Sequence, residues 1–237
     1  METNNFFSRA WRIIKRTIII LFIAQLVYII LLKWIYPPLT ITQFVSWITG
    51  HGLKRDYISR NSISPNARLA VIASEDQLFP DHNGFDLKSI QKAMKHNQKS
   101  RSLHGASTIS QQTAKNVFLW QGRSWIRKTL EVYFTFMIEK IWGKRRILEM
   151  YMNVVEMGNG IFGIEAAAKN SFNRSSANLS RQQAALIAAA LPNPKKYTVK
   201  PVCRYVSIRS GWVLRPMNNL SADPDIREAV YYASTVH

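Results

Sequence analysis

Cysteine is almost absent from this chain. Cys203 is the only one among 237 residues, so no disulfide can form within the chain, and a small disulfide-stapled domain is excluded. The five histidines are scattered and, with a single cysteine, give no spacing typical of a zinc site. Stability must come from a hydrophobic core, which 47% hydrophobic residues and seven tryptophans can supply.

Acidic residues are also scarce. The chain has 14 Asp and Glu against 32 Lys and Arg, which gives a formal net charge of +18. Such an excess points to an anionic partner. Nucleic acid, phospholipid headgroups and phosphorylated substrates all fit this description, and charge alone does not choose between them.

Alternating strand patterns are sparse, and the best of them covers residues 205–214. Helical patterns dominate instead. They predict a helix over 66–76, one that Asp86 caps, one over 124–141, one over 144–155, and an Ala-rich one from Ser180 to Pro192. The sequence therefore predicts a mostly α fold.

One long segment lacks charge altogether. Residues 17–32 contain no charged side chain and, with their apolar neighbours, reach the roughly 20 residues that a membrane-spanning helix needs. Arg9, Arg12, Lys15 and Arg16 precede the segment. By the positive-inside rule this end is cytoplasmic, and the chain after about residue 37 lies outside.

A cleaved signal peptide is the alternative interpretation of this segment. Its apolar core is normally about 7–15 residues long and is followed by small residues at the cleavage site. The segment is longer, and residues 33–38 offer no such site. A retained transmembrane helix, ended by Pro37 and Pro38, is therefore expected.

The first candidate for chemistry is the acidic pair Glu75 and Asp76, at the end of an apolar helix. A carboxylate that emerges from an apolar helix is partly desolvated, which raises its pKa toward values useful to a general base. The alternative is a solvated helix end. An acidic pair at a helix C-terminus opposes the helix dipole, which favours a functional role.

The second candidate runs from Gly105 to Asn116. Ser107 or Thr108 can cap a helix on which Gln111 and Lys115 share a face. Hydroxyls, amides and a lysine after a glycine suit a sugar or a phosphate, although an ordinary capped polar helix would have a similar pattern.

The third candidate contains Arg123, Arg127, Lys128 and Glu131. The spacing places Glu131 within reach of Arg127 and Lys128 on one helix, so these residues are either surface ion pairs or a cationic site for pyrophosphate with a second carboxylate. A Gly-x-Gly-x-x-Gly string at 158–163 follows a helix rather than a strand, so a dinucleotide loop is rejected.

Together these blocks resemble the peptidoglycan glycosyltransferase family (glycosyltransferase family 51), in order from about residue 65 to 216. The matching positions are Glu75, Asp76, Phe79, His82 and Gly84; Gly105, Ser107, Thr108, Ile109, Gln111, Gln112, Lys115 and Asn116; Arg127, Lys128 and Glu131; Lys144, Ile147, Leu148, Glu149 and Tyr151; and 191–194. Ordered blocks at compatible spacing are far more specific than any one of them. The chain length resembles the monofunctional biosynthetic form.

The resemblance implies a lysozyme-like helical domain that polymerises lipid II, with Glu75 as general base. It implies that Lys115 and Arg123 hold the donor pyrophosphate. Glu131 would assist there, through a divalent cation (Mg or Mn) or by positioning Lys128. The remaining substrate-binding positions that it implies are Asp76, Ser107, Thr108, Gln111, Gln112, Asn116 and Arg127. His82, Glu149 and Tyr151 are expected to be structural.

The expected organisation has five parts: a basic cytoplasmic segment (1–16), a transmembrane helix (17–36), a membrane-proximal linker (37–64), the glycosyltransferase domain (65–216) and a C-terminal tail (217–237). The resemblance implies the bacterial inner membrane as location and lipid II with the growing glycan chain as partners. Cell-wall synthesis or division proteins are further candidate partners, and nucleic acid is not expected.

Two rival functions stay open at this stage. A lysozyme-like peptidoglycan hydrolase would also use carboxylates on a helical fold, but it needs neither a pyrophosphate site nor an anchor. A non-catalytic, membrane-tethered binder of anionic polymers would explain the charge of +18. The expected topology places the basic domain away from DNA, and no nucleic-acid-binding motif occurs.

Overall fold

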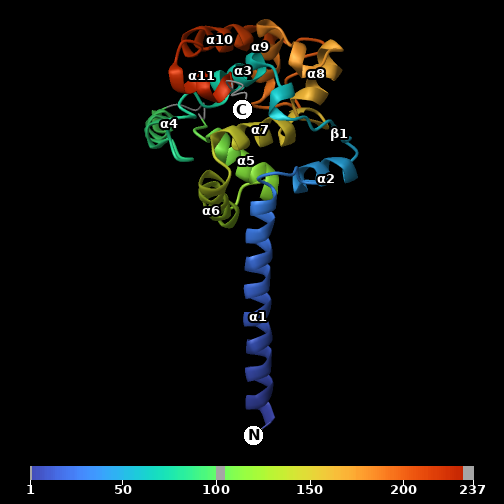
Figure 1. Ribbon diagram of the computed structural model, residues 1–237, viewed down its shortest axis with the longest axis vertical. Coiled ribbons are helices and arrows are strands. Elements are labelled where there is room, and N and C mark those ends of the chain that lie inside the picture. Colours follow the sequence, from blue (N-terminus) through green and yellow to red (C-terminus); the bar gives the residue numbers. More distant parts are fainter. Residues whose placement is uncertain (1, 100–104, 232–237) are drawn as a thin grey trace, which may run out of the picture. The chain divides into compact units, whose positions relative to one another are not determined.

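The computed structural model describes residues 2–99 and 105–231, and the chain divides into two compact units, Met1–Tyr36 and Pro37–His237. Helices make up most of both units (Figure 1). The expectation of a mostly α protein is thus confirmed.

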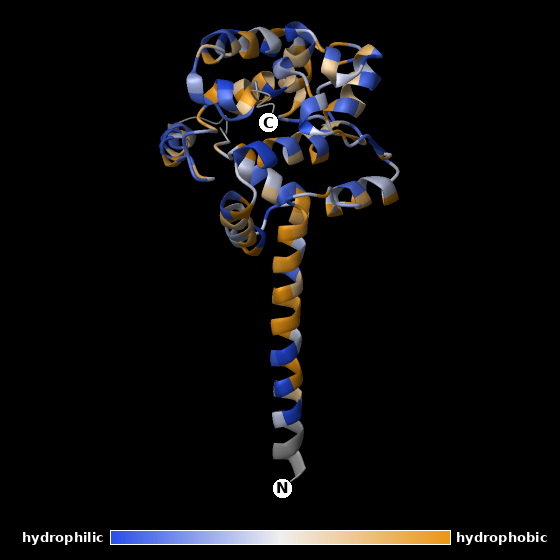
Figure 2. Cartoon of the chain, in the orientation of Figure 1, coloured by the Kyte–Doolittle hydropathy of each residue, from blue (hydrophilic) through white to orange (hydrophobic). Residues whose placement is uncertain are grey.

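The first unit is formed by one long helix, α1 (Glu2–Leu31). Within it, the 24 residues Ser8–Leu31 have a mean hydropathy of 2.1 and are long and apolar enough to cross a membrane, as an anchor or a signal sequence would be. Figure 2 shows apolar residues along most of α1 after a polar stretch near its start. The helix starts before residue 17, where we expected it, and ends at Leu31, so Pro37 and Pro38 do not terminate it.

The second unit contains all the other elements. Its helices are α2 (Ile41–Ile48), α3 (Pro65–Glu75), α4 (Leu87–Lys99), α5 (Ile109–Phe118), α6 (Trp125–Ile141), α7 (Lys144–Val154), α8 (Ile164–Phe172), α9 (Arg181–Ala190), α10 (Arg204–Leu220) and α11 (Pro224–Val230). Two 3-10 turns, η1 (Arg60–Ser62) and η2 (Ser176–Asn178), join them.

Local sequence signals explain where the central helices begin. Ser64 caps α3 through the backbone N–H of Ala67, and Pro65 occupies the first helical position, where its missing N–H is not needed. Ser180 and Gln183 form a capping box at the start of α9. The buried positions of α3 and α9 are mostly alanines with a few larger aliphatic side chains, so α3, α9 and α10 pack closely around one core.

The Gly-x-Gly-x-x-Gly string forms a small hairpin. β2 (Glu156–Gly158) and β3 (Ile161–Phe162) are antiparallel, and β1 (Lys54–Arg55) adds to β3 in parallel, giving the order β1-β3-β2. Gly163 has φ of +84°, and a Cβ there would lie 2.6 Å from the carbonyl oxygen of Asn153. The glycines therefore serve a tight turn and close packing, in agreement with the rejection of a dinucleotide loop.

The best alternating pattern, over 205–214, does not form a strand, because this segment is the first part of α10. The buried residues of α10 are Val206, Ser210, Val213 and Met217, a helical spacing of four, three and four. Helical burial against α3 and α9 thus overrides a short alternating pattern. The expected tail also begins inside α10, and α11 follows it; residues 232–237 lie outside the described part.

Two helices have their apolar residues on the outside. In α2, Thr42, Gln43 and Ser46 are buried, whereas Phe44 and Trp47 are exposed. The buried residues of α6 are Arg127, Glu131, Thr135 and Ile138. Its exposed apolar residues are Trp125, Ile126, Val132 and Phe136.

Ile126 belongs to the apolar spacing that predicts the helix over 124–141, but 73% of its surface is exposed. Around Ile126, the inner stripe of α6 is instead occupied by the ion pair of Arg127 and Glu131. Polar residues thus face inward in the first turns of α6, whereas Ile138 is buried nearer its end.

Candidate functional site

Glu75 lies at the last position of α3 and its side chain is half-buried. Its Oε2 accepts a hydrogen bond of 2.9 Å from Gln112 Nε2, and its Oε1 accepts one of 3.2 Å from the Ser74 hydroxyl. Burial raises the pKa of Glu75, and this effect outweighs the lowering by Gln112, by the charge of Arg209 and by Ser74. A carboxylate in this environment is suited to accept a proton.

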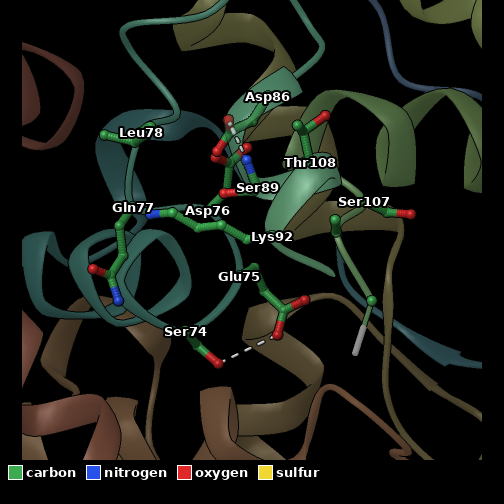
Figure 3. A pocket seen from close by; sticks show the side chains of 12 residues that line it. Ser74, Glu75, Asp76, Gln77, Leu78, Asp86, Ser89, Lys92, Ser107 and Thr108 are labelled. Atoms are coloured by element: carbon green, nitrogen blue, oxygen red, sulfur yellow. Dashed lines mark hydrogen bonds between the residues drawn. The ribbon is translucent and has the colours of Figure 1, made fainter. Parts of the chain in front are cut away.

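A cavity of about 420 Å³ opens beside Glu75 (Figure 3). Figure 3 shows the Glu75 carboxylate between the end of α3 and the segment that carries Ser107. The lining residues are Ser74, Glu75, Asp76, Gln77, Leu78, Asp86, Ser89, Lys92, Gly105, Ala106, Ser107 and Thr108. Most of these are polar, so the cavity suits a hydroxyl-rich ligand.

Gln112 connects Glu75 to the core. Its Oε1 accepts a hydrogen bond of 3.2 Å from the hydroxyl of Tyr151, which is fully buried on α7. Because Tyr151 donates to this oxygen, the amide nitrogen of Gln112 is turned toward Glu75. Gln112, which we predicted to bind substrate, therefore also orients the carboxylate, and Tyr151 holds Gln112 in place.

Asp76 holds the end of α3 against the start of α5. Its carboxylate accepts a 2.9 Å hydrogen bond from the backbone N–H of Ile109 and lies 3.0 Å from His82 Nε2. His82 Nδ1 accepts from the backbone N–H of Gly84 at 3.1 Å. The proton of a neutral His82 is thus on Nε2, directed at Asp76, so the histidine links Asp76 to the backbone of Gly84.

Thr108 and Gln111 belong to the same junction. They form a capping box at the start of α5, and the Thr108 hydroxyl donates a 2.7 Å hydrogen bond to the carbonyl of Gly84. Both side chains are buried, whereas Ser107 is exposed on the cavity wall. Of these three predicted substrate-binding residues, Ser107 and Thr108 line the cavity, and Ser107 is the exposed one.

A second, cationic cluster lies on α6. Glu131 is buried and contacts Arg127 Nη1 at 2.7 Å and Lys128 Nζ at 2.5 Å. Lys115 on α5 is half-buried, and burial lowers its pKa while the charge of Glu131 raises it. The charge of Glu75 also raises the pKa of Lys115. Lys115 therefore interacts electrostatically with both carboxylates.

The contacts of Glu131 discriminate between its two expected roles. Both of its carboxylate oxygens are engaged by cations, and the described residues contain no group of three or more His, Cys, Asp and Glu side chains that could hold a metal ion. A lone carboxylate among positive charges does not fit the oxygen-rich shell that Mg²⁺ prefers. The arrangement favours positioning of Lys128 over a protein-bound cation.

The other predicted site residues are placed less centrally. Arg123 is exposed in the loop between α5 and α6. Asn116 is buried and donates a 2.9 Å hydrogen bond to the carbonyl of Gln112 one turn before it. Asn116 therefore supports α5, whereas the backbone loop around Arg123 leaves that side chain accessible to a ligand.

Arg209 and Lys92 were missed by the sequence reasoning. Arg209 lies on α10, and its positive charge lowers the pKa of Glu75. The alternating pattern over 205–214 gave no reason to place Arg209 near Glu75. Lys92 lines the cavity from α4. The apolar spacing of that helix predicted its existence, but nothing in the pattern indicated that the charge of Lys92 belongs to the site.

A family model described as Transglycosylase matches residues 42–218, which include both clusters. The chain belongs to the transglycosylase family. The mostly α, lysozyme-like fold that the resemblance implied is thereby confirmed. The match begins at residue 42, within the segment that we expected to be a linker.

Relatives of this transglycosylase match over most of its length. A protein named biosynthetic peptidoglycan transglycosylase from Yersinia pestis (strain Pestoides F) is 46% identical over 230 residues, 94% of this chain and 95% of the relative. A protein of the same name from Cronobacter sakazakii (strain ATCC BAA-894) is 50% identical over 184 residues, 76% of each chain. Both alignments support the resemblance drawn from the motifs.

Proposed function

We propose that this transglycosylase is a peptidoglycan glycosyltransferase that polymerises lipid II into glycan strands. The observation that carries the proposal is the pairing of the Glu75 carboxylate, whose pKa is raised by burial, with the cations of Lys115 and the α6 cluster. A base and an anion site side by side suit a sugar acceptor and a phosphorylated donor. The names of the two relatives support the same activity.

In this mechanism Glu75 takes the proton from the 4-hydroxyl of the acceptor's N-acetylglucosamine. The oxygen attacks the anomeric carbon of the donor's N-acetylmuramic acid as the bond from that carbon to the pyrophosphate oxygen breaks. Polyprenyl pyrophosphate leaves, and inversion gives a β-1,4 linkage. A positioned general base contributes typically about 10²–10⁴ in rate. The hydrogen bond from Gln112 fixes the carboxylate toward the cavity.

The cationic cluster acts on the leaving group. Negative charge grows on the pyrophosphate as its bond to the sugar breaks, so cations at that point stabilise the transition state more than the ground state. Lys115 is the central cation, with Lys128 and Arg123 on the more exposed side. Glu131 holds Lys128 and Arg127 in position and compensates part of the local positive charge.

The molecule also has the features of an enzyme that works on a lipid-linked substrate. We propose that α1 anchors it in the bacterial inner membrane, with the second unit in the periplasm, because basic residues precede the apolar run. The exposed apolar residues of α2 and α6 suit contact with the lipid surface. Arg123 and Lys128, near the exposed residues of α6, would meet anionic headgroups.

The rival functions explain less of the site. A hydrolase has no use for Lys115 and the α6 cations beside its carboxylate, because its substrate carries no pyrophosphate. A passive anionic-polymer binder has no need of a desolvated carboxylate held by Gln112 and Tyr151. Synthesis from a lipid-pyrophosphate donor uses both features.

The test is to give the full-length protein two substrates in parallel. With labelled lipid II in detergent we expect polymeric glycan and release of polyprenyl pyrophosphate. With purified mature peptidoglycan we expect no new reducing ends. Reducing ends from mature wall without polymer from lipid II would show a hydrolase and overturn the proposal. Salt-sensitive binding to anionic polymers with neither reaction would favour the binder.

A further inference from the structure

The α10 helix carries an exposed aromatic surface that the proposed reaction does not use. Trp212 is 69% exposed, Ile208 56% and Tyr205 37%. These three residues and Arg209 line a cavity of about 280 Å³. We call this surface, made of Tyr205, Ile208, Arg209 and Trp212, the α10 platform.

Neighbouring side chains support the rings of the α10 platform. The ring of Tyr197 stacks on that of Tyr205, with centroids 3.8 Å apart and planes 14° apart. Arg215 lies over Trp212 with its guanidinium carbon 6.0 Å from the ring centroid. Val206 and Val213, on the opposite side of the helix, are buried in the core. The aromatic rings therefore sit on a fixed support, as a preformed binding surface requires.

Arg209 connects the platform to the reaction centre. It lines the platform cavity, and its charge also acts on the Glu75 carboxylate. The helix that carries it packs against α3, which ends at Glu75. Its Nε is buried and donates no hydrogen bond to any described residue, so the guanidinium has unused donor capacity.

We infer that the α10 platform binds a sugar ring of the glycan strand, next to the ring that reacts at Glu75. This rests on the proposed function, since it assigns a further subsite to the same polymer. The face of a pyranose ring presents C–H bonds that pack well on the electron-rich face of Trp or Tyr. A cavity of about 280 Å³ has room for one such ring. The guanidinium of Arg209, which lines the cavity, can donate a hydrogen bond to the carbonyl of an N-acetyl group.

A lipid chain or the membrane surface fits the platform less well. The exposed apolar residues of α2 and α6 lie at the end of the second unit away from α10, as Figure 1 shows for the three helices. A bilayer that contacts α2 and α6 would therefore leave α10 facing water. A glycan strand, by contrast, extends into water from its lipid-linked end.

The experiment measures binding of lipid-free glycan oligosaccharides, four to six sugars long, to the full-length protein in detergent. Saturation-transfer NMR maps the bound sugars, and calorimetry gives the Kd. Trp212→Ala should weaken binding roughly tenfold, and Trp212→Tyr should restore most of it, because the aromatic face is retained. Trp47→Ala is the matched control, because Trp47 is 60% exposed on α2, and should leave the Kd unchanged.

Repeating the titration with Glu75→Gln separates this inference from the proposed function. Oligosaccharide binding that depends on Trp212 in this variant supports the platform even if the wild type makes no polymer. An unchanged Kd in Trp212→Ala, with an intact thermal unfolding transition, overturns the inference. So does a variant that binds oligosaccharide normally but loses binding to anionic lipid vesicles, because the platform would then contact lipid.

Discussion

At the scale of single residues, the two acidic groups of the site differ in their surroundings. Glu75 has amide and hydroxyl donors and a buried setting, whereas Glu131 has two cations within 2.7 Å. Environments that differ in this way assign different tasks to two carboxylates. Glu75 is suited to move a proton, and Glu131 is suited to hold the cations that meet the donor.

The acid limb of the activity profile follows from Glu75. Its pKa is raised above the ordinary value of 4.5, and only the deprotonated form can accept a proton. Polymerisation should therefore decline, as the pH falls, at a higher pH than an ordinary carboxyl would give. Burial lowers the pKa of Lys115 below 10.5, so the alkaline decline should also come earlier than for an exposed lysine.

Initial rates of polymerisation are measured over a range of pH with the lipid II concentration well below KM. Under these conditions the acid and alkaline declines in rate give the pKa values of the free enzyme. Unfolding is monitored at each pH, so that loss of structure is not taken for titration. A rate that stays constant down to pH 4.5 would show that no carboxylate with a raised pKa takes part.

At the scale of elements, the junction between α3 and α5 positions the site. Asp76 accepts from Ile109 and His82, and Asp76→Asn replaces one acceptor oxygen with a donor that faces the Nε2 proton of His82. A buried group left without its partner destabilises by about 1–3 kcal/mol. We expect a loss of that size in the free energy of unfolding, together with lower activity, because the Glu75 backbone is adjacent.

Chemical denaturation of the full chain in detergent measures this loss. Asp81→Asn is the control, since Asp81 is exposed, and should change the free energy of unfolding little. Equal stability of Asp76→Asn and the wild type would mean that the junction does not hold the two helices together.

Helix caps were the most predictive signals in the sequence. Thr108 and Ser180 accept hydrogen bonds from the backbone as expected, because capping depends on residues within one turn. The segment 205–214 was misassigned because three of its large apolar residues, Tyr205, Ile208 and Trp212, are exposed. An interpretation that treats every apolar residue as buried predicts the wrong secondary structure where apolar residues are exposed.

The same reason limits what could be predicted of the site. Glu75 and Lys115 were found through motifs, but the electrostatic interaction between them depends on how α3, α5 and α6 pack. Nothing local indicates that Gln112 turns toward Glu75, because Tyr151, which directs it, lies 39 residues away along the chain. Arg209 was hidden by the wrong secondary structure at its position.

At the scale of the whole molecule, the net positive charge and the exposed apolar residues of α2 and α6 both favour contact with an anionic lipid surface. Replacing Trp125, Ile126 and Phe136 of α6 with Ser removes exposed apolar area without touching the buried stripe of that helix. In lipid bilayers we expect the apparent KM for lipid II to rise by about tenfold. A smaller effect is expected in detergent, where the substrate is not confined to a surface.

The matched control for this triple variant exchanges exposed polar residues, Asn218→Ser and Asn219→Ser on α10. It should keep the wild-type KM in both media. A triple variant with an unchanged KM in bilayers would show that α6 does not contact the lipid surface.

The measurement that tests the central claim most directly is polymerisation of lipid II by Glu75→Gln. Gln keeps the size and the polar contacts of the side chain but cannot accept the proton of the 4-hydroxyl. We predict loss of at least about 100-fold in rate, with a folded protein that still binds the substrate. Glu228→Gln, an exposed carboxylate on α11, should retain wild-type activity. Near-normal polymerisation by Glu75→Gln would contradict the account.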